Sequence, residues 1–427
     1  MSGWNAVLVG LVLVGYALVS GRLRRSPITS AIVFTTAGLI LGSIAFGVFD
    51  VTIGSSQLRF LAEVTLALVL FVDASSIDTR RLGREASIHA RLLGLGLPGS
   101  ILLGTALAAL VFPELLVFEA MTLAILLAPT DAALGQAVVS DTRLPSMVRQ
   151  GLNVESGLND GICVPLLVAA LSLAEAEEGF DPGGEVVIDL VTELAIAGAV
   201  GAGVGLSVAL LLRWSSRRDW LEPAWAQIVP MVTAIGAYAA VDELGGSGFI
   251  GAFVAGLVYG RVLETVARET SAFTRDLGDV LSAVTFVFFG AVFVQIDGST
   301  LSLRTIGFAV LALTLIRMVP VALSLVGSGA RAPTVAFIGW FGPRGLATIV
   351  FTLIVVEESG LAGTAQIVDV ATMTVLLSVF AHGLSAVVLS DRYRTWFDRH
   401  RDELSMETRD VDLEIQPRRP RRGGAAR

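Results

Sequence analysis

The segment VESGLNDG, residues 154–161, places two carboxylates and two neutral polar side chains directly before the apolar run ICVPLLVAALSLA. At about 100° per residue, Ser156 and Asp160 share one face of a helix, and Glu155 and Asn159 share the neighbouring face. A carboxylate with a hydroxyl on its own face is the all-oxygen site that hard cations prefer. Because a carboxylate also accepts a proton, the pattern predicts a site where a monovalent cation and a proton compete. The other face is expected to hold a structural partner.

Further charged side chains lie inside apolar runs. The segments are LFVDASS with Asp73, LLAPTDAALG with Thr130 and Asp131, GWFGPRGLATIV with Arg344, and LTLIRMVP with Arg317. A charge within a membrane span costs about 2.5 to 3.5 kcal/mol or more, so such residues mark functional sites by default. For Asp131 two roles are open, direct ligation of the cation or neutralisation of helix N-termini. Asp73 either belongs to the site or reaches the water at the headgroups.

The chain must place these residues in a bilayer. Of its 427 residues 54% are hydrophobic and only 16% are charged, which is typical of an integral membrane protein. Apolar runs long enough to cross a bilayer recur along the chain, and backbone in lipid must be helical. We therefore expect an all-α protein with thirteen spans. They are near residues 4–20, 30–48, 57–77, 92–112, 115–139, 154–175, 186–212, 223–241, 247–264, 276–295, 304–326, 333–356 and 366–389.

Two of these spans contain helix breakers. Pro129 lies in the fifth span, and Gly342, Pro343 and Gly345 lie in the twelfth. Interrupted spans at corresponding places of two halves are the best sequence pointer to a transporter's binding site. Since the offset of seven spans is odd, spans 1–6 and 8–13 form an inverted repeat with span 7 as the linker. The two discontinuous helices are expected to cross.

The basic residues indicate the orientation of the chain. All 30 are arginines, and 26 fall in alternate loops or in the tail, which are therefore assigned to the cytoplasm. The N-terminus is then outside, and GRLRR follows the first span instead of preceding it, unlike a signal peptide. Residues 1–390 form the transmembrane domain, and the Arg-rich tail 391–427 is expected to be disordered. The basic inner face fits a cell membrane protein and gives no reason to expect a nucleic acid partner.

These motifs together resemble the NhaP-type sodium/proton antiporters of the monovalent cation/proton antiporter-1 family. The family's Thr-Asp pair falls on Thr130 and Asp131, its Gly-x-Arg-Gly on Gly342–Gly345, and its Glu-Ser-x-x-Asn-Asp on residues 155–160. The resemblance covers nearly all thirteen spans. It implies a six-helix core that moves against a dimerisation domain, a homodimer, and exchange of Na⁺ or Li⁺ for H⁺ without a cofactor or an enzymatic reaction.

The resemblance also implies a role for each residue. Asp160 is the carrier carboxylate, with Ser156, Thr130, Asp131 and Asp73 as further cation or proton ligands. Glu155 forms a structural bridge with Arg344, and Arg317 contacts the acids of the core, although the sequence does not say which. Related electrogenic exchangers have an aspartate where this chain has Asn159, and the chain contains no lysine. Electroneutral one-for-one exchange is therefore expected.

Other interpretations compete with this one. A K⁺/H⁺ antiporter of the same fold is open, because selectivity depends on fine spacing of oxygens. GGSG at 245–248 and His382 match the serine and histidine of an intramembrane protease, but Ser247 is at the outer edge of a span. A passive cation channel does not explain carboxylates beside broken helices. Gly201 and Gly205 have the spacing of a close helix contact, which fits an intrachain, lipid-facing or dimer surface.

Overall fold

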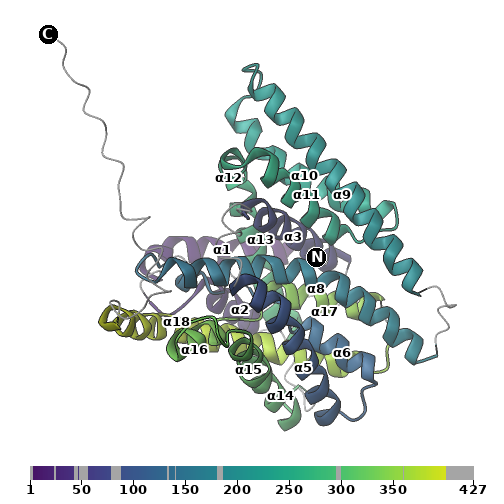
Figure 1. Ribbon diagram of the computed structural model, residues 1–427, viewed down its shortest axis with the longest axis vertical. Coiled ribbons are helices and arrows are strands. Elements are labelled where there is room, and N and C mark those ends of the chain that lie inside the picture. Colours follow the sequence, from purple (N-terminus) through teal and green to yellow (C-terminus); the bar gives the residue numbers. More distant parts are fainter. Residues whose placement is uncertain are drawn as a thin grey trace.

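The computed structural model describes residues 3–23, 26–42, 47, 56–77, 88–131, 134–139, 141–179, 186–294, 300–358 and 360–400. Every regular element in this part of the chain is a helix (Figure 1). Among the described residues, eight helices are long and apolar enough to cross a membrane, and four shorter apolar helices accompany them. The protein is therefore all-α and multi-pass.

Each of the thirteen predicted spans overlaps one helix or two consecutive helices. The single helices are α1 (Gly3–Leu23), α2 (Ser30–Leu41), α3 (Ser56–Ser76), α8 (Ser146–Glu177), α9 (Val186–Ser216), α10 (Pro223–Glu243), α11 (Gly248–Leu263) and α18 (Thr364–His400). The composite spans are η1 with α5 (Leu92–Gly96, Leu97–Val111), α6 with α7 (Val117–Leu126, Gln136–Val139), α13 with η2 (Ala272–Phe288, Phe289–Phe293), α14 with α15 (Leu303–Leu313, Leu315–Ser324) and α16 with α17 (Ala332–Trp340, Leu346–Glu358). Short α12 (Thr265–Thr270) joins α11 to α13.

One bundle contains α1–α3 and α9–α13, and α11 lies in its centre against α3, α9 and α10. This close packing depends on small residues. A Cβ on Gly201 would lie 2.6 Å from the carbonyl oxygen of Gly251, and one on Gly205 would overlap the backbone at Ala255. The Gly201 and Gly205 pair therefore makes an intrachain contact between α9 and α11, which decides among the alternatives left by the sequence.

The other bundle contains η1 and α5–α8 with α14–α18, and Figure 1 shows most of it below α9–α12. In chain order, three spans enter the first bundle and three enter the second. After α9, three more spans enter the first bundle and three more enter the second. This repeated order is the one expected of an inverted repeat with the seventh span as its linker.

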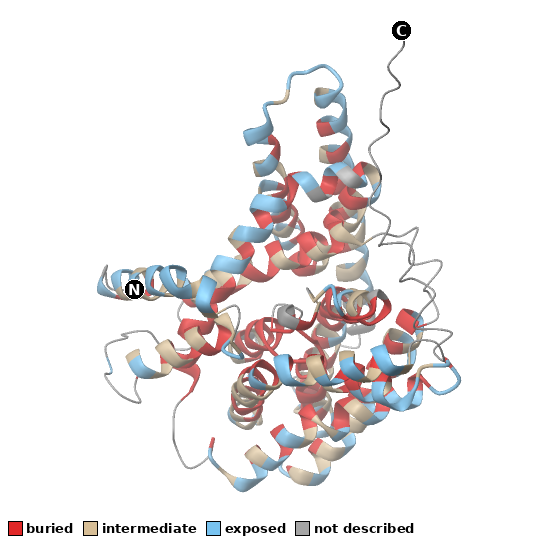
Figure 2. Cartoon of the chain, turned by 90° about the vertical axis from the view of Figure 1, so that its left-hand side faces the viewer, coloured by how far each residue is buried: buried red, intermediate tan, exposed pale blue. Residues whose placement is uncertain are grey.

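The outer surfaces of both bundles are apolar. Leu18 of α1 is 82% exposed, Leu102 of α5 is 71% exposed and Leu211 of α9 is 62% exposed. Figure 2 shows α1, at the N-terminus, and the upper hairpin of α9 and α10 as largely exposed. Large apolar side chains spread over such surfaces are stabilised by lipid, so these faces are the membrane-facing ones.

The helix at the end of the chain is longer than predicted. α18 continues to His400, so residues 391–400, which the sequence assigned to the disordered tail, are helical. Tyr393 and Phe397 are buried, and Tyr393 stacks on Phe337 with ring centroids 4.5 Å apart. These aromatic contacts with α16 explain the extension. The remaining tail, residues 401–427, lies outside the described residues.

The fifth and twelfth spans are broken where the prolines predicted. α6 ends at Leu126 and α7 begins at Gln136, while α16 ends at Trp340 and α17 begins at Leu346. The two non-helical segments meet, since the Asp131 N–H donates a hydrogen bond of 2.8 Å to the Pro343 carbonyl oxygen. The breaks are thus buried against each other within protein, as backbone at membrane depth requires.

Candidate functional site

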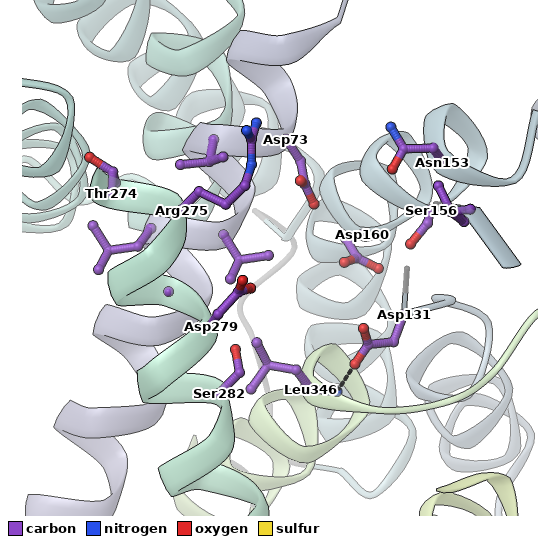
Figure 3. A pocket seen from close by; sticks show the side chains of 15 residues that line it. Asp73, Asp131, Asn153, Ser156, Asp160, Thr274, Arg275, Asp279, Ser282 and Leu346 are labelled. Atoms are coloured by element: carbon purple, nitrogen blue, oxygen red, sulfur yellow. Dashed lines mark hydrogen bonds between the residues drawn. The ribbon is translucent and has the colours of Figure 1, made fainter. Parts of the chain in front are cut away.

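A polar cavity of about 190 Å³ lies between the two bundles (Figure 3). The second bundle contributes α8, the break before α7 and the start of α17, and the first bundle contributes α3 and α13. The polar side chains that line the cavity are Asp73, Asp131, Asn153, Ser156, Asp160, Thr274, Arg275, Asp279 and Ser282. The cavity is therefore lined by charged and polar side chains of both bundles.

One face of α8 supplies the centre of the cavity. Ser156 and Asp160 line it together, and Asp160 is only 6% exposed. Its Oδ1 atom has no hydrogen-bond partner among the described residues. Gly157 brings α3 close to this face, because a Cβ at Gly157 would lie 3.2 Å from the Cβ of Asp73. A buried carboxylate oxygen without a donor is suited to bind a cation or a proton.

The other polar groups of α8 hold the broken fifth span in place. The Ser156 hydroxyl donates to the Thr130 carbonyl oxygen. The Asn159 amide donates to the Thr130 hydroxyl at 2.8 Å and accepts the Thr130 N–H at 3.3 Å. Thr130 is not among the residues that line the cavity. Its N–H, carbonyl oxygen and hydroxyl all form hydrogen bonds with Ser156 or Asn159 of α8, so Thr130 lies at the edge of the site. Ser156 itself lines the cavity.

Asp131 connects the two broken spans. One of its oxygens, Oδ2, accepts the N–H of Leu346 at 2.9 Å, and Oδ1 accepts the N–H of Leu134 at 3.3 Å. Leu346 is the first residue of α17, where an unpaired N–H and the helix dipole favour a negative charge. Asp131 thus caps a half-helix while it also lines the cavity.

The partner of Glu155 differs from the one expected. Arg317 of α15 donates two hydrogen bonds to the Glu155 carboxylate, at 2.5 and 2.8 Å, and both side chains are almost fully buried. The predicted bridge between Glu155 and Arg344 is therefore wrong. Two parallel N–H···O contacts satisfy the geometry of a guanidinium and a carboxylate, so this pair fastens α8 to α15.

Arg344 instead stabilises the break in the fifth span. Its side chain is 1% exposed, and it donates to the carbonyl oxygens of Ala128 and Pro129, each at 3.1 Å. These carbonyls follow the C-terminal end of α6, where a cation is favoured by the helix dipole. Arg344 lies in the break of the twelfth span, directly beside them, which explains why it does not reach Glu155.

The glycines around Arg344 make room for these contacts. A Cβ on Gly342 would lie 2.5 Å from the Nε atom of Arg317, and one on Gly345 would overlap the Asp131 carboxylate. Any side chain at Gly345 would therefore displace the Asp131 cap from α17. The GPRG segment thus packs against Arg317 at Gly342, binds the carbonyl oxygens of the fifth span through Arg344, and packs against Asp131 at Gly345.

Ser247 and His382, the residues of the protease interpretation, lie in different bundles. Both ring nitrogens of His382 have partners within the second bundle, the carbonyl oxygen of Trp340 at 2.9 Å and Ser378. Ser247 lies at the start of α11 in the first bundle. The structure does not bring Ser247 and His382 together, and His382 instead supports the broken span at Trp340.

Several residues that line the cavity are not predicted by the sequence motifs. Asn153 lies one turn before the site on α8, and Arg275 and Asp279 lie one turn apart on α13. Asp279 falls inside the tenth predicted span, so its charge in an apolar run was a usable signal. Nothing in the sequence indicates that α13 lies across from α8, because that depends on how the two bundles pack.

The comparisons with known proteins agree with this architecture. The family described as sodium/hydrogen exchanger, transmembrane, matches residues 8–391. The chain is 26% identical over 80% of its length to a K(+)/H(+) antiporter NhaP of Alkalimonas amylolytica, a match that spans 58% of that relative. It is 25% identical over 88% of its length to the low-affinity Na(+)/H(+) antiporter NhaS1 of Synechocystis, a match that spans 72% of that relative.

A solved structure has the same fold. The sodium proton antiporter MjNhaP1 of Methanocaldococcus jannaschii superposes with a TM-score of 0.74 at 22% identity, over 92% of this chain and 99% of that one. The arrangement of the helices is therefore that of an NhaP-type antiporter.

Proposed function

Because the chain belongs to the sodium/hydrogen exchanger family, we propose that it is a secondary antiporter that exchanges Na⁺ or Li⁺ for H⁺. The observation that carries the proposal is the Asp160 carboxylate, buried in a cavity between two bundles with one oxygen lacking a hydrogen-bond donor among the described residues. A cation and a proton exclude each other at this group. Coupling follows from that exclusion as the bundles move between two membrane faces.

The other ligands are assigned by their positions. Ser156 lies on the same face as Asp160 and keeps oxygen lone pairs available after donating to Thr130. Asp131 and Asp73 line the same cavity and supply further oxygens. Thr130 contributes by holding the backbone of the break near the site. Glu155, Arg317, Asn159 and Arg344 form the frame that fixes these groups.

Electroneutral exchange is part of the proposal. Asn159 donates through its amide nitrogen to the Thr130 hydroxyl, a contact that an ionised carboxylate at this position would not make. Of the two neighbours Asn159 and Asp160, only Asp160 can then change its charge in the cycle. Exchange of one Na⁺ for one H⁺ at a single carboxylate moves no net charge.

We also propose that the cavity opens to the cytoplasm in this conformation. Asp73 lies in the last turn of α3 and Thr274 in the first turn of α13. The arginine distribution assigns both of these helix ends to the inner side. The protein is expected to work as a homodimer in the cell membrane, as the family resemblance implies.

The test is exchange in proteoliposomes, with internal pH followed by a dye after addition of Na⁺, Li⁺ or K⁺. Proton movement driven by Na⁺ or Li⁺ and unchanged when valinomycin and K⁺ clamp the voltage would support electroneutral sodium/proton exchange. A response to K⁺ alone would favour the K⁺/H⁺ alternative, which the name of the Alkalimonas relative also suggests. No proton movement with any of the three cations would overturn the proposal.

A further inference from the structure

The wall of the cavity opposite Asp160 carries charges that the exchange cycle above does not use. Asp279 and Arg275 lie one turn apart on α13 and both line the cavity. Asp276 lies between them on the same helix but is absent from the lining. The helix therefore presents one carboxylate and one guanidinium to the cavity and turns a second carboxylate away from it.

Figure 3 shows how these groups converge. The Asp279 carboxylate points into the cavity toward Asp160, and Asp73 of α3 points into it from above. Arg275 lines the same cavity as these two carboxylates. The two carboxylates of this wall, Asp73 and Asp279, share the space in front of Asp160 with a single positive side chain.

The degree of burial of each charged side chain indicates the order in which an entering cation reaches it. Arg275 and Asp279 are exposed and Asp73 is half-buried, whereas Asp160 is 6% exposed and has a carboxylate oxygen without a hydrogen-bond partner in the described structure. A hydrated cation that enters the cavity reaches the exposed wall first. The cation loses its hydration shell in steps, and the carboxylates that line the cavity lower the free energy of this desolvation.

We propose that Asp279 forms an outer station for the transported monovalent cation, that Asp73 is a ligand shared by this station and the Asp160 site, and that Arg275 weakens the station by its positive charge. The inference rests on the proposed antiport and adds a second binding position to it. With the positive Arg275 beside them, these carboxylates attract a cation less strongly than they would alone, so the station attracts a cation without holding it. Asp160 remains the position where the cation and the proton exclude each other.

The test is sodium-dependent proton movement in proteoliposomes with Asp279→Asn, Arg275→Gln and the matched control Asp276→Asn. Loss of one negative charge at the station should raise the KM for Na⁺ about three- to tenfold, with the maximal rate unchanged. Arg275→Gln should lower KM by a similar factor. Asp276→Asn removes the same charge outside the cavity and should leave KM within about twofold of the unmodified protein.

Ionic strength provides a second measurement. Because the station acts through charge at a hydrated entrance, raising choline chloride from about 10 mM to about 300 mM should shrink the difference between Asp279→Asn and the unmodified protein. A KM for Asp279→Asn equal to that of Asp276→Asn would overturn the station. So would a lower maximal rate at unchanged KM, since that places Asp279 in the translocation step. An unmodified protein that moves no protons would overturn the antiport itself, and the station with it.

Discussion

The two walls of the cavity differ in how their charges are held. Behind the α8 wall, outside the lining of the cavity, Glu155 is paired with Arg317 and Arg344 binds carbonyl oxygens. In the lining itself, Asp131 caps α17. Asp160 is the carboxylate of that wall with an oxygen that has no hydrogen-bond partner among the described residues. On the α13 wall, Arg275 and Asp279 are exposed and line the cavity. The charges in and behind the α8 wall are thus paired or hydrogen-bonded apart from one oxygen of Asp160, whereas the charges on the α13 wall are exposed.

This contrast has a physical basis. Charges buried without water must be paired or bonded, since an unpaired buried charge costs several kcal/mol. Charges at a hydrated entrance need no such partner and contribute mainly to attraction at a distance. Substitutions of the charged residues in and behind the α8 wall should therefore abolish transport or lower stability, whereas those on the α13 wall should change the apparent affinity for the cation.

The largest effect is expected from Asp160→Asn. The amide keeps the shape of the side chain but neither ionises nor accepts a proton, so exchange should fall at least about 100-fold, to the level of protein-free liposomes. The melting temperature in detergent should stay within a few degrees, because Asp160 forms no salt bridge within the part of the chain that the structure describes. Measurable exchange in this variant would remove Asp160 from the centre of the mechanism.

The next effect is on stability. Arg317→Ala leaves Glu155 buried without its partner, which should cost about 3 to 5 kcal/mol of folding free energy. Thermal unfolding in detergent measures this, with Arg304→Ala as the control. Arg304 is also an arginine near an acid, but its side chain is 66% exposed and lies 4.0 Å from Glu114. Equal melting temperatures for the two variants would contradict the buried bridge.

A smaller loss of stability is expected for Arg344→Ala. Its partners are the neutral carbonyl oxygens of Ala128 and Pro129, so the cost should be about 1 to 3 kcal/mol. The same melting experiment ranks it below Arg317→Ala. If Arg344→Ala proved the more damaging of the two, the assignment of Arg317 as the partner of Glu155 would have to be reversed.

The smallest effect is expected from Ser156→Ala. Loss of one neutral oxygen ligand and of the hydroxyl bond to Thr130 should raise the KM for Na⁺ about two- to fivefold. Ser172→Ala is the control, because Ser172 donates to the Val168 carbonyl on the same helix and does not line the cavity. Identical KM values for both variants would show that Ser156 only holds the broken span.

Lowering the pH should also reduce the apparent affinity for Na⁺. If a cation and a proton compete for Asp160, lowering the pH raises the KM for Na⁺ and leaves the maximal rate at saturating Na⁺ unchanged. Initial rates at several pH values test this relation. A fall in the maximal rate with constant KM would indicate that the proton acts at a different group.

Much of this protein follows from its sequence. Apolar runs of sufficient length must become helices in a bilayer, so the spans were predicted close to their observed places. Pro129 and the Gly342–Gly345 segment indicated where two of the spans break. Proline alone was not decisive, since Pro165, Pro230 and Pro320 lie inside helices. The helical period also separates Ser156 and Asp160 from Glu155 and Asn159, which the structure places toward the cavity and toward other helices respectively. These features depend on residues that are near one another in the chain.

The tertiary structure decided the pairings between distant segments. Arg317 and Arg344 are both buried arginines, and their local sequences do not indicate which one reaches Glu155, 162 residues from Arg317 in the chain. Only the crossing of the two broken spans places Arg344 against Ala128 and Pro129. In the same way, Asp279 meets the site only because α13 of one bundle packs across a cavity from α8 of the other. Contacts of this kind depend on the packing angles of whole helices, which no local pattern of residues specifies.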